Sequence, residues 1–393
     1  MSDPSQGQMS QEGPSWLSFF ASTRLTLIII GVLILLSLIG ALVPQQGILE
    51  ESGIFEWKQE HPTVTPVLSK LGLFATFHSP LFLISLAILF LNTLSCTYQS
   101  IIKDGLFSGN EPSIRLRRLG FLILHISILV CMAGGFVSAA FRMSGLIILT
   151  EGQTFKDQYQ NYSKLIEGPF RKEQHDKFEV ELIDAQFEAP TDWWAGRKHS
   201  SIRLSTNETD PFIAEIEFNQ PFRFKKITFT VQEIGFSPEI SITSRNPQIP
   251  PFNGFIALKV WGVNKDREHR DFLPLPHSDQ RLMLNLFPSH SISNGVAIKT
   301  SETVENPALT VHLESSDGIQ TPKQLIEPGK RVEVDDLNIH FGELRYWASF
   351  LVVQDPGYPI VCISFWMAII ALVLRYTPDI LDWIKEARND GKG

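Results

Sequence analysis

The sequence predicts an integral membrane protein with four transmembrane α-helices and one large extracytoplasmic all-β domain inserted between helices 3 and 4. Three observations support this fold class: four long apolar stretches, a strand-rich region between the third and the fourth, and an uneven distribution of Lys and Arg in the loops. The chain has 393 residues, 44% of them hydrophobic and 19% charged, which is too apolar for a disordered chain. A net charge of -8 argues against nucleic-acid binding, and three cysteines are too few for a disulfide-stapled domain.

The four apolar stretches are each long enough to cross a membrane, which takes roughly 17–25 residues. They contain no Asp, Glu, Lys or Arg except Arg375 at the last position, and a soluble core helix of this length would normally show a polar stripe. The first stretch is too long for a signal peptide and no cleavage motif follows it. We therefore expect spans at 25–43, 81–99, 119–141 and 358–375.

Lys and Arg in the short loops predict the orientation of these spans. The loop 100–118 contains one lysine and three arginines, whereas the loop 44–80 has two lysines beside four glutamates. We therefore expect 100–118 on the cytoplasmic side and 44–80 outside. Four spans then place both the N-terminal segment 1–24 and the C-terminal tail 376–393 in the cytoplasm. The expected location is the inner membrane of a bacterium, because the start of the chain does not resemble a transit peptide.

The region 142–357 has the pattern of an antiparallel β domain. Apolar and polar residues alternate in short runs, for example at 178–183, 227–231 and 337–341. Clusters of turn-forming residues such as 245–254 separate these runs. Many short strands without intervening helices predict a sandwich or a barrel. With the orientation above, this domain lies on the extracytoplasmic side.

His125 is the only histidine inside a predicted span. It follows Arg118 by seven residues, which is about 10 Å at 1.5 Å per residue, so it is expected in the cytoplasmic half of the membrane. Ionisable residues inside a membrane are costly and often functional, and neutral imidazole is a common ligand of haem iron. Position alone leaves two interpretations open, an iron ligand or a histidine that hydrogen-bonds between helices. One histidine cannot supply both axial ligands of one iron.

Other chemistry is missing from the sequence. The three cysteines all lie in predicted spans, and there is no C-x-x-C or C-x-x-C-H. No phosphate loop, G-x-S-x-G or H-E-x-x-H occurs. We therefore predict no catalytic residue in this chain and regard His125 as the one metal-ligand candidate. His78, at the outer edge of the second span, is a weaker candidate for a cofactor contact.

Several short motifs occur in a fixed order along nearly the whole chain. The motifs are Val43-Pro-Gln45, Ser79-Pro80, Leu119-Gly-Phe-Leu-Ile-Leu-His-Ile-Ser-Ile-Leu129 with Gly134-Gly135, Phe218-Asn-Gln-Pro-Phe222 and Asp355-Pro-Gly357. Together with the layout of the spans they resemble the ResB (CcsB) family of system II cytochrome c biogenesis proteins.

The resemblance implies a membrane subunit that is not catalytic on its own but is required in a haem lyase complex. Its partner would be a multi-span protein of the CcsA (ResC) type, and the two would move haem to the outer face and attach it to apocytochrome c. The resemblance also implies that His125 is an axial ligand of a transient haem b, with the opposite ligand on the partner. Membrane lipid is a further expected partner, and nucleic acid is not.

Two other functions are compatible with the residues. The first is a membrane-anchored b-type haem electron carrier, which would retain haem when purified alone. The second is a scaffold for a membrane complex that binds no haem, in which His125 is structural.

Overall fold

The computed structural model describes residues 19–46, 51–104, 111–172, 175, 177–187, 198–206, 208–261, 267–293 and 296–390. The predicted N-terminal segment therefore lies mostly outside the described residues, as does the middle of the loop 100–118. The chain forms two compact units, Met1–Ser138 with Gly357–Gly393, and Ala139–Pro356. We call them the helical unit and the β unit and describe each by itself.

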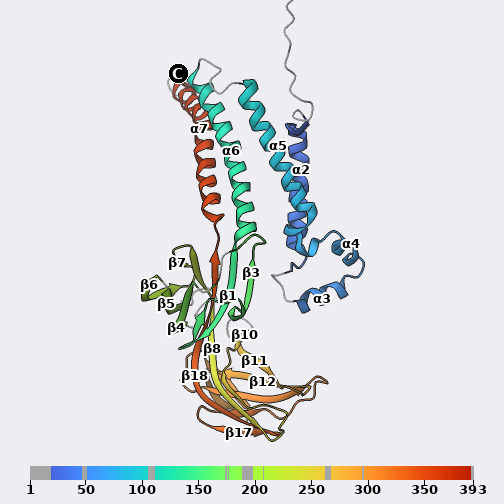
Figure 1. The fold of residues 1–393 in the computed structure, drawn as a ribbon, viewed down its shortest axis with the longest axis vertical. Helices are drawn as coiled ribbons and strands as arrows, with labels where there is room; N and C mark the ends of the chain where they lie inside the picture. The colour runs from blue at the N-terminus through green and yellow to red at the C-terminus, as the bar shows by residue number, and fades with distance from the viewer. Residues whose placement is uncertain are drawn as a thin grey trace, which may run out of the picture. The chain divides into compact units, whose positions relative to one another are not determined.

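Four helices of the helical unit are long and apolar enough to cross a membrane, as predicted. Only 11% to 28% of the residues in their apolar windows are buried, so most of their apolar surface is available to lipid. Shorter helices lie between the first and second of them (Figure 1). The helices are α2 (Thr23–Leu42), α3 (Glu51–Glu60), α4 (Thr65–Lys70), the 3-10 helix η1 (Leu73–His78), α5 (Pro80–Asp104), α6 (Pro112–Phe141) and α7 (Tyr358–Asp390).

The Ser79-Pro80 motif begins α5. Proline suits the first helical position, where an N–H would have no partner. The Oγ of Ser79 accepts a hydrogen bond from the Phe82 N–H at 3.3 Å, which caps another free N–H of the first turn. Ser79 is buried because α5 starts against η1.

Helices α6 and α7 pack closely along a seam of small residues. A Cβ added to Gly120 would lie 2.7 Å from the Ala371 carbonyl oxygen, and one added to Gly134 would lie 2.9 Å from Val361 Cγ2. Small residues allow such close approach of two helix backbones. The small positions repeat every seven residues: Gly120, Ser127 and Gly134 on α6, and Gly357, just before α7, with Ser364 and Ala371 on α7.

The β unit follows α6 directly, and α7 follows the β unit. The strands are β1 (Met143–Thr150), β2 (Thr154–Lys156), β3 (Lys164–Glu167), β4 (Phe178–Phe187), β5 (Lys198–Thr206), β6 (Thr209–Glu217), β7 (Phe222–Phe224), β8 (Ile227–Ser244), β9 (Phe252–Phe255), β10 (Lys259–Trp261), β11 (Glu268–Pro274), β12 (Gln280–Phe287), β13 (Ser289–Ser293), β14 (Val296–Ser301), β15 (Ala308–Ser315), β16 (Gln324–Ile326), β17 (Arg331–Val334) and β18 (Leu337–Gln354).

The first and last strands of the β unit are neighbours. Strand β1 begins at Met143, two residues after α6 ends, and pairs antiparallel with β18, whose last residue Gln354 faces Met143. Strand β18 in turn pairs with β8 along almost its whole length. The main sheet has the order β3-β1-β18-β8-β7.

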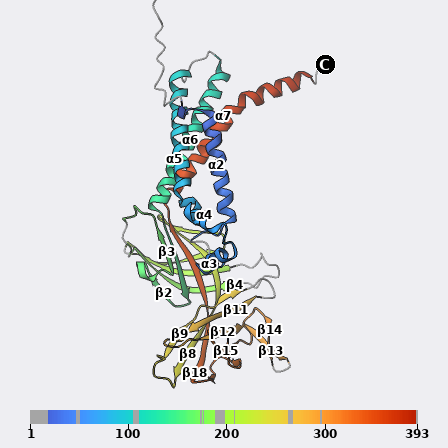
Figure 2. The same ribbon diagram turned by 90° about the vertical axis from the view of Figure 1, so that its right-hand side faces the viewer.

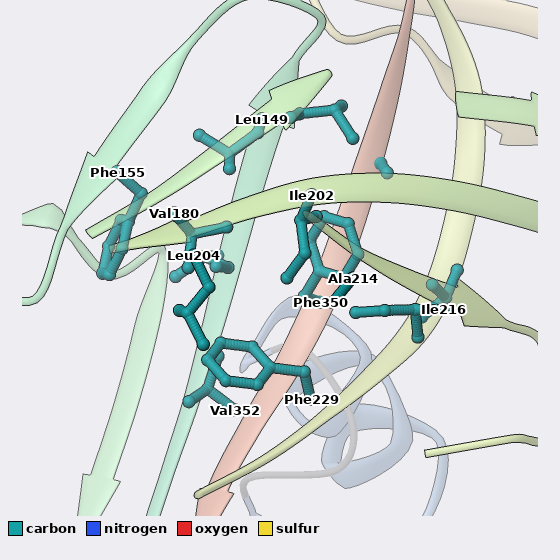
Figure 3. Close-up of a cluster of buried hydrophobic side chains, with 14 of the residues drawn as sticks. Leu149, Phe155, Val180, Ile202, Leu204, Ala214, Ile216, Phe229, Phe350 and Val352 are labelled. Carbon is teal, nitrogen blue, oxygen red and sulfur yellow. The ribbon is translucent and has the colours of Figure 1, made fainter. Parts of the chain in front are cut away.

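The β unit contains two hydrophobic cores, and β8 and β18 contribute to both. The first core packs one end of the main sheet against the sheet β2-β4-β5-β6 and includes Ile202, Phe229 and Phe350 (Figure 3). The second core packs the other end against the sheet β10-β11-β12-β15-β16 and includes Phe236, Leu284 and Phe341. Figure 2 shows β11, β12 and β15 beside β8 and β18.

The strand-rich character of this region is confirmed, but its organisation differs from the single sandwich or barrel that we expected. The runs at 227–231 and 337–341 are the ends of two strands of 18 residues each. Gly342 interrupts the alternation where the pairing register of β18 shifts between Phe341 and Leu344, opposite Pro238. Proline and glycine inside strands commonly mark bulges, so each long strand resembles two short ones in the sequence.

Candidate functional site

His125 lies on α6 with one ring nitrogen engaged. Its Nδ1 is 2.9 Å from the carbonyl oxygen of Phe121, one turn earlier on the same helix. The two rings are also in contact, with centroids 4.0 Å apart and an angle of 41° between their planes. The histidine side chain is half-buried. Both contacts restrict the orientation of the imidazole.

The hydrogen bond determines which nitrogen of His125 can bind a metal. A carbonyl oxygen only accepts, so Nδ1 must donate its proton to Phe121. A neutral imidazole then has its free lone pair on Nε2. Metal-bound histidines commonly have this arrangement, with the second nitrogen donating to a carbonyl or a carboxylate. The geometry therefore fits coordination of an iron atom through Nε2.

His125 lies on a different face of α6 from the seam with α7. At 3.6 residues per turn it is about 140° around the helix axis from Gly120 and about 180° from Gly134. Because both glycines contact α7, His125 does not point into that seam. Phe121 lies nearer to the seam, with the guanidinium of Arg375 on α7 5.9 Å from its ring centroid. The imidazole thus lies on the side of α6 away from the seam.

Asn92 is a buried amide inside the predicted span 81–99 that was not identified from the sequence. It is 1% exposed. Its Oδ1 accepts a hydrogen bond from Thr26 at 2.7 Å, and its amide donates to the carbonyl oxygens of Phe20 and Ser22. These bonds hold the start of α2 against α5. All of them are within the chain, so Asn92 has a structural role, and only its type, an amide in an apolar stretch, could have indicated it.

Gln45 of the Val-Pro-Gln motif is also buried and fully bonded. Its amide nitrogen donates to the carbonyl oxygens of Val43 at 2.9 Å and Leu73 at 3.1 Å, and its Oε1 accepts from the Thr76 N–H at 2.9 Å. The motif therefore joins the end of α2 to η1. The hydrogen bonds of Gln45 stabilise this junction, so we assign the motif a structural role.

His78, the weaker candidate, is exposed in η1. Cys96, Cys131 and Cys362 are half-buried free thiols, and Cys96 Sγ is 3.6 Å from the Ala21 carbonyl oxygen. Within the described part of the chain, no group of three or more His, Cys, Asp and Glu side chains could hold a metal ion.

Two networks of ionisable side chains lie in the β unit, and their members are buried or half-buried. In the first, Asp157 accepts hydrogen bonds from Tyr162 at 2.7 Å and from His175 at 2.8 Å. Burial and then the bond to Asp157 raise the pKa of Tyr162. In the second, Glu302 bonds His269 at 2.8 Å and Lys299 at 2.6 Å.

Glu302 stays ionised in this second network. Burial raises the pKa of Glu302, but the bonds from His269 and Lys299 together lower it below its ordinary value. The network therefore holds β11 to the turn after β14. Neither network was identified from the sequence, because its members are far apart in the chain.

Comparisons with known proteins identify the family of the chain. The model of the ResB-like family matches residues 23–103 and 114–392. A search of curated proteins gives no match. The solved structure "Cytochrome c Heme Lyase CcmF" matches 80% of this chain and 34% of its own, with 10% sequence identity and a TM-score of 0.27. The chain therefore spans about a third of the length of that protein, and a TM-score of this size does not establish a shared fold.

Proposed function

Because the chain belongs to the ResB-like family, we propose that it is the membrane subunit of a system II cytochrome c synthetase. In this role it handles haem within the membrane for delivery to the outer face. Covalent attachment to apocytochrome c takes place together with a partner of the CcsA (ResC) type. The chain itself is a required subunit and does not form the bonds.

The observation that best supports this proposal is the geometry of His125. Its Nδ1 is occupied by the Phe121 carbonyl, so Nε2 is available to the iron of haem, the cargo of the complex. The hydrogen bond also makes the imidazole a better electron donor and prevents it from rotating. The contact with the Phe121 ring supports the same orientation.

The second axial ligand is proposed to come from the partner. His125 supplies one nitrogen and faces away from the seam between α6 and α7, so a histidine from another protein could approach from the opposite side of the porphyrin. Haem would then be held at the contact between two chains. Such sharing is compatible with transient binding, because separation of the chains removes one of the two ligands.

The orientation in the membrane follows from the charges at the ends of the helices. Arg115, Arg117 and Arg118 lie at the start of α6, and Arg375 lies near the end of the apolar part of α7. Under the positive-inside rule these ends are cytoplasmic. The β unit is then extracytoplasmic, where it would position the partner and the apocytochrome.

The test compares visible spectra of the complex purified after co-expression with its partner. We expect His125→Ala to lose most of the bound haem or to change its axial ligation. In a His125→Gly variant, added imidazole should restore haem, because the small ligand can occupy the vacated position. Unchanged haem content and ligation in His125→Ala would contradict the proposal.

His61→Ala is the matched control. The Nδ1 of His61 bonds the carbonyl oxygen of Trp57, also one turn earlier, at 3.0 Å, and the two rings stack at 4.3 Å. The local geometry thus resembles that of His125, but His61 directly follows α3 and lies outside the membrane-spanning candidates. Haem content should be unaffected. Haem retained by the chain alone would favour an electron carrier, and loss of assembly without a haem defect would favour a scaffold.

A further inference from the structure

The loop after β3 returns to the last turn of α6. The Gly168 N–H donates to the Arg142 carbonyl oxygen at 2.8 Å, and the Phe170 N–H donates to the Ala140 carbonyl oxygen at 3.0 Å. A Cβ on Gly168 would clash with the Ala140 carbonyl oxygen, so only glycine allows this approach. The loop 168–172 is therefore attached to the end of a membrane-spanning candidate.

This attachment determines the depth of the loop relative to a membrane. Residues 119–141 of α6 contain no Asp, Glu, Lys or Arg, and Arg142 is the first charged residue after them. The change from apolar to charged residues marks the place where acyl chains give way to headgroups. Because the Phe170 N–H bonds the Ala140 carbonyl, Phe170 lies at this boundary whichever way the helix crosses the membrane.

The side chains displayed at this level are those found at membrane interfaces. Phe170 is 56% exposed and Phe141 is 40% exposed, and their ring centroids are 6.3 Å apart. Arg142 and Lys172 are exposed beside them. Aromatic rings favour the boundary region of a bilayer, and long cationic side chains reach from it to lipid phosphates.

The loop is held from its other side, which leaves Phe170 exposed. The side chain of Arg171 is 4% exposed. It pairs with Glu167 and donates to the Gln354 side-chain oxygen at 3.2 Å. Gln354 is the last residue of β18, so Arg171 joins the loop to the strand that leads into α7. With Arg171 directed inward, its neighbour Phe170 is directed outward.

We propose that the loop 168–172 is a membrane-interface anchor of the β unit. Phe170 and Phe141 lie between the acyl chains and the headgroups of phospholipids, and Arg142 and Lys172 bind the phosphates. The anchor holds the loop 168–172 at the surface of the bilayer. It does not depend on haem binding.

The test measures the depth of a spin label in the full chain, reconstituted without a partner in vesicles of phosphatidylcholine and phosphatidylglycerol. Phe170→Cys is labelled in a background carrying Cys96→Ala, Cys131→Ala and Cys362→Ala. Ile319→Cys is the control, because Ile319 is 72% exposed and lies in a loop between β15 and β16. We expect the label at 170 to collide with oxygen several-fold more, relative to a water-soluble nickel chelate, than the label at 319.

Equal access of the chelate to both labels would overturn the proposal. A second measurement leaves the sequence unchanged. A phospholipid with a photoactivated group near its headgroup should attach to the peptide containing Phe170. Attachment to the spans without attachment to this peptide would likewise overturn the proposal.

Discussion

Two buried amide side chains of the helical unit form their hydrogen bonds with partners within the chain. Gln45 and Asn92 use both ends of their amides within the chain, so they are structural. His125 uses Nδ1 in the same way but has a second nitrogen to offer. This difference separates residues that stabilise the fold from the one proposed to bind cargo, and residue type alone does not reveal it.

Gln45→Ala should destabilise the helical unit. It leaves the Leu73 carbonyl and the Thr76 N–H without their side-chain partner, at a cost of about 1–3 kcal/mol for a buried group. Thermal unfolding in detergent should show a lower midpoint. Gln46→Ala is the control, since the Gln46 side chain is exposed and its backbone N–H still bonds Phe74. Equal midpoints for the two variants would contradict the prediction.

Glu302 should make the stability of the β unit depend on acid pH. Its lowered pKa means that ionisation is favoured in the folded state, so its contribution is present above the ordinary value of 4.5. The contribution is lost as the pH falls through the lowered value. Glu302→Gln should therefore be less stable than the wild type at neutral pH, with a difference that shrinks in acid. Unfolding curves at a series of pH values measure this.

Glu333→Gln provides the comparison for Glu302. Glu333 pairs with Arg245 on the surface, where ion pairs contribute little. This variant should follow the wild type at every pH. A Glu302→Gln difference that stays constant across the series would show that the carboxylate charge is unimportant.

Helices α6 and α7 pack against each other through small residues. Gly120 approaches Ala371 closely, and Gly134 approaches Gly357, which lies just before α7; this antiparallel register brings Ser127 and Ser364 to the same level. The Gly120 and Gly134 contacts with α7 place the two helices in this register. The ion pair of Arg117 with Asp379 at 2.6 Å joins the same two helices. The seam therefore determines which face of α6 is left for His125.

Gly134→Leu should force α6 and α7 apart. Even a Cβ at this position would lie 3.0 Å from the Val361 backbone nitrogen, and backbone cannot move aside as a side chain can. We expect a lower unfolding midpoint in detergent and weaker disulfide cross-linking of Ser127→Cys with Ser364→Cys. Gly135→Leu is the matched control, because nothing lies within 4 Å of its added Cβ. Equal effects of both leucines would argue against the seam.

At the scale of the whole molecule, the two hydrophobic cores of the β unit are connected by the same pair of long strands, β8 and β18. Strands β8 and β18 pair from Ile227 opposite Gln354 to Ser244 opposite Leu337. Phe350 belongs to the first core and Phe236 to the second, and both are fully buried. Because the same strands line both cores, we expect that disrupting one core also destabilises the other.

Phe350→Ala tests this coupling. The cavity should cost about 3–5 kcal/mol. Hydrogen exchange should then become faster not only in β4 and β5 of the first core but also in β12 and β15 of the second. Phe272→Ala, a change to a side chain that is 44% exposed on β11, should have little effect on either. Faster exchange confined to β4 and β5 would mean that the two cores open independently.

Much of the fold and part of the site could be predicted from local sequence. The four spans are contiguous runs of apolar residues, and the strand-rich region shows its alternation within a few residues. His125 was identified because it interrupts such a run. The two-core organisation was not predicted, because Pro238 and Gly342 make each long strand resemble two.

The sequence by itself determined the number of spans, the strand-rich region between the last two and the family, because transfer into a membrane and local backbone preference depend on neighbouring residues. Only the tertiary structure decided which face of α6 meets α7, which nitrogen of His125 has no hydrogen bond to Phe121, and which strands contribute to both cores. These features depend on contacts such as Gly120 with Ala371, between residues at distant points of the chain. Such contacts form only when the backbones come close enough to pack, and no local pattern specifies them.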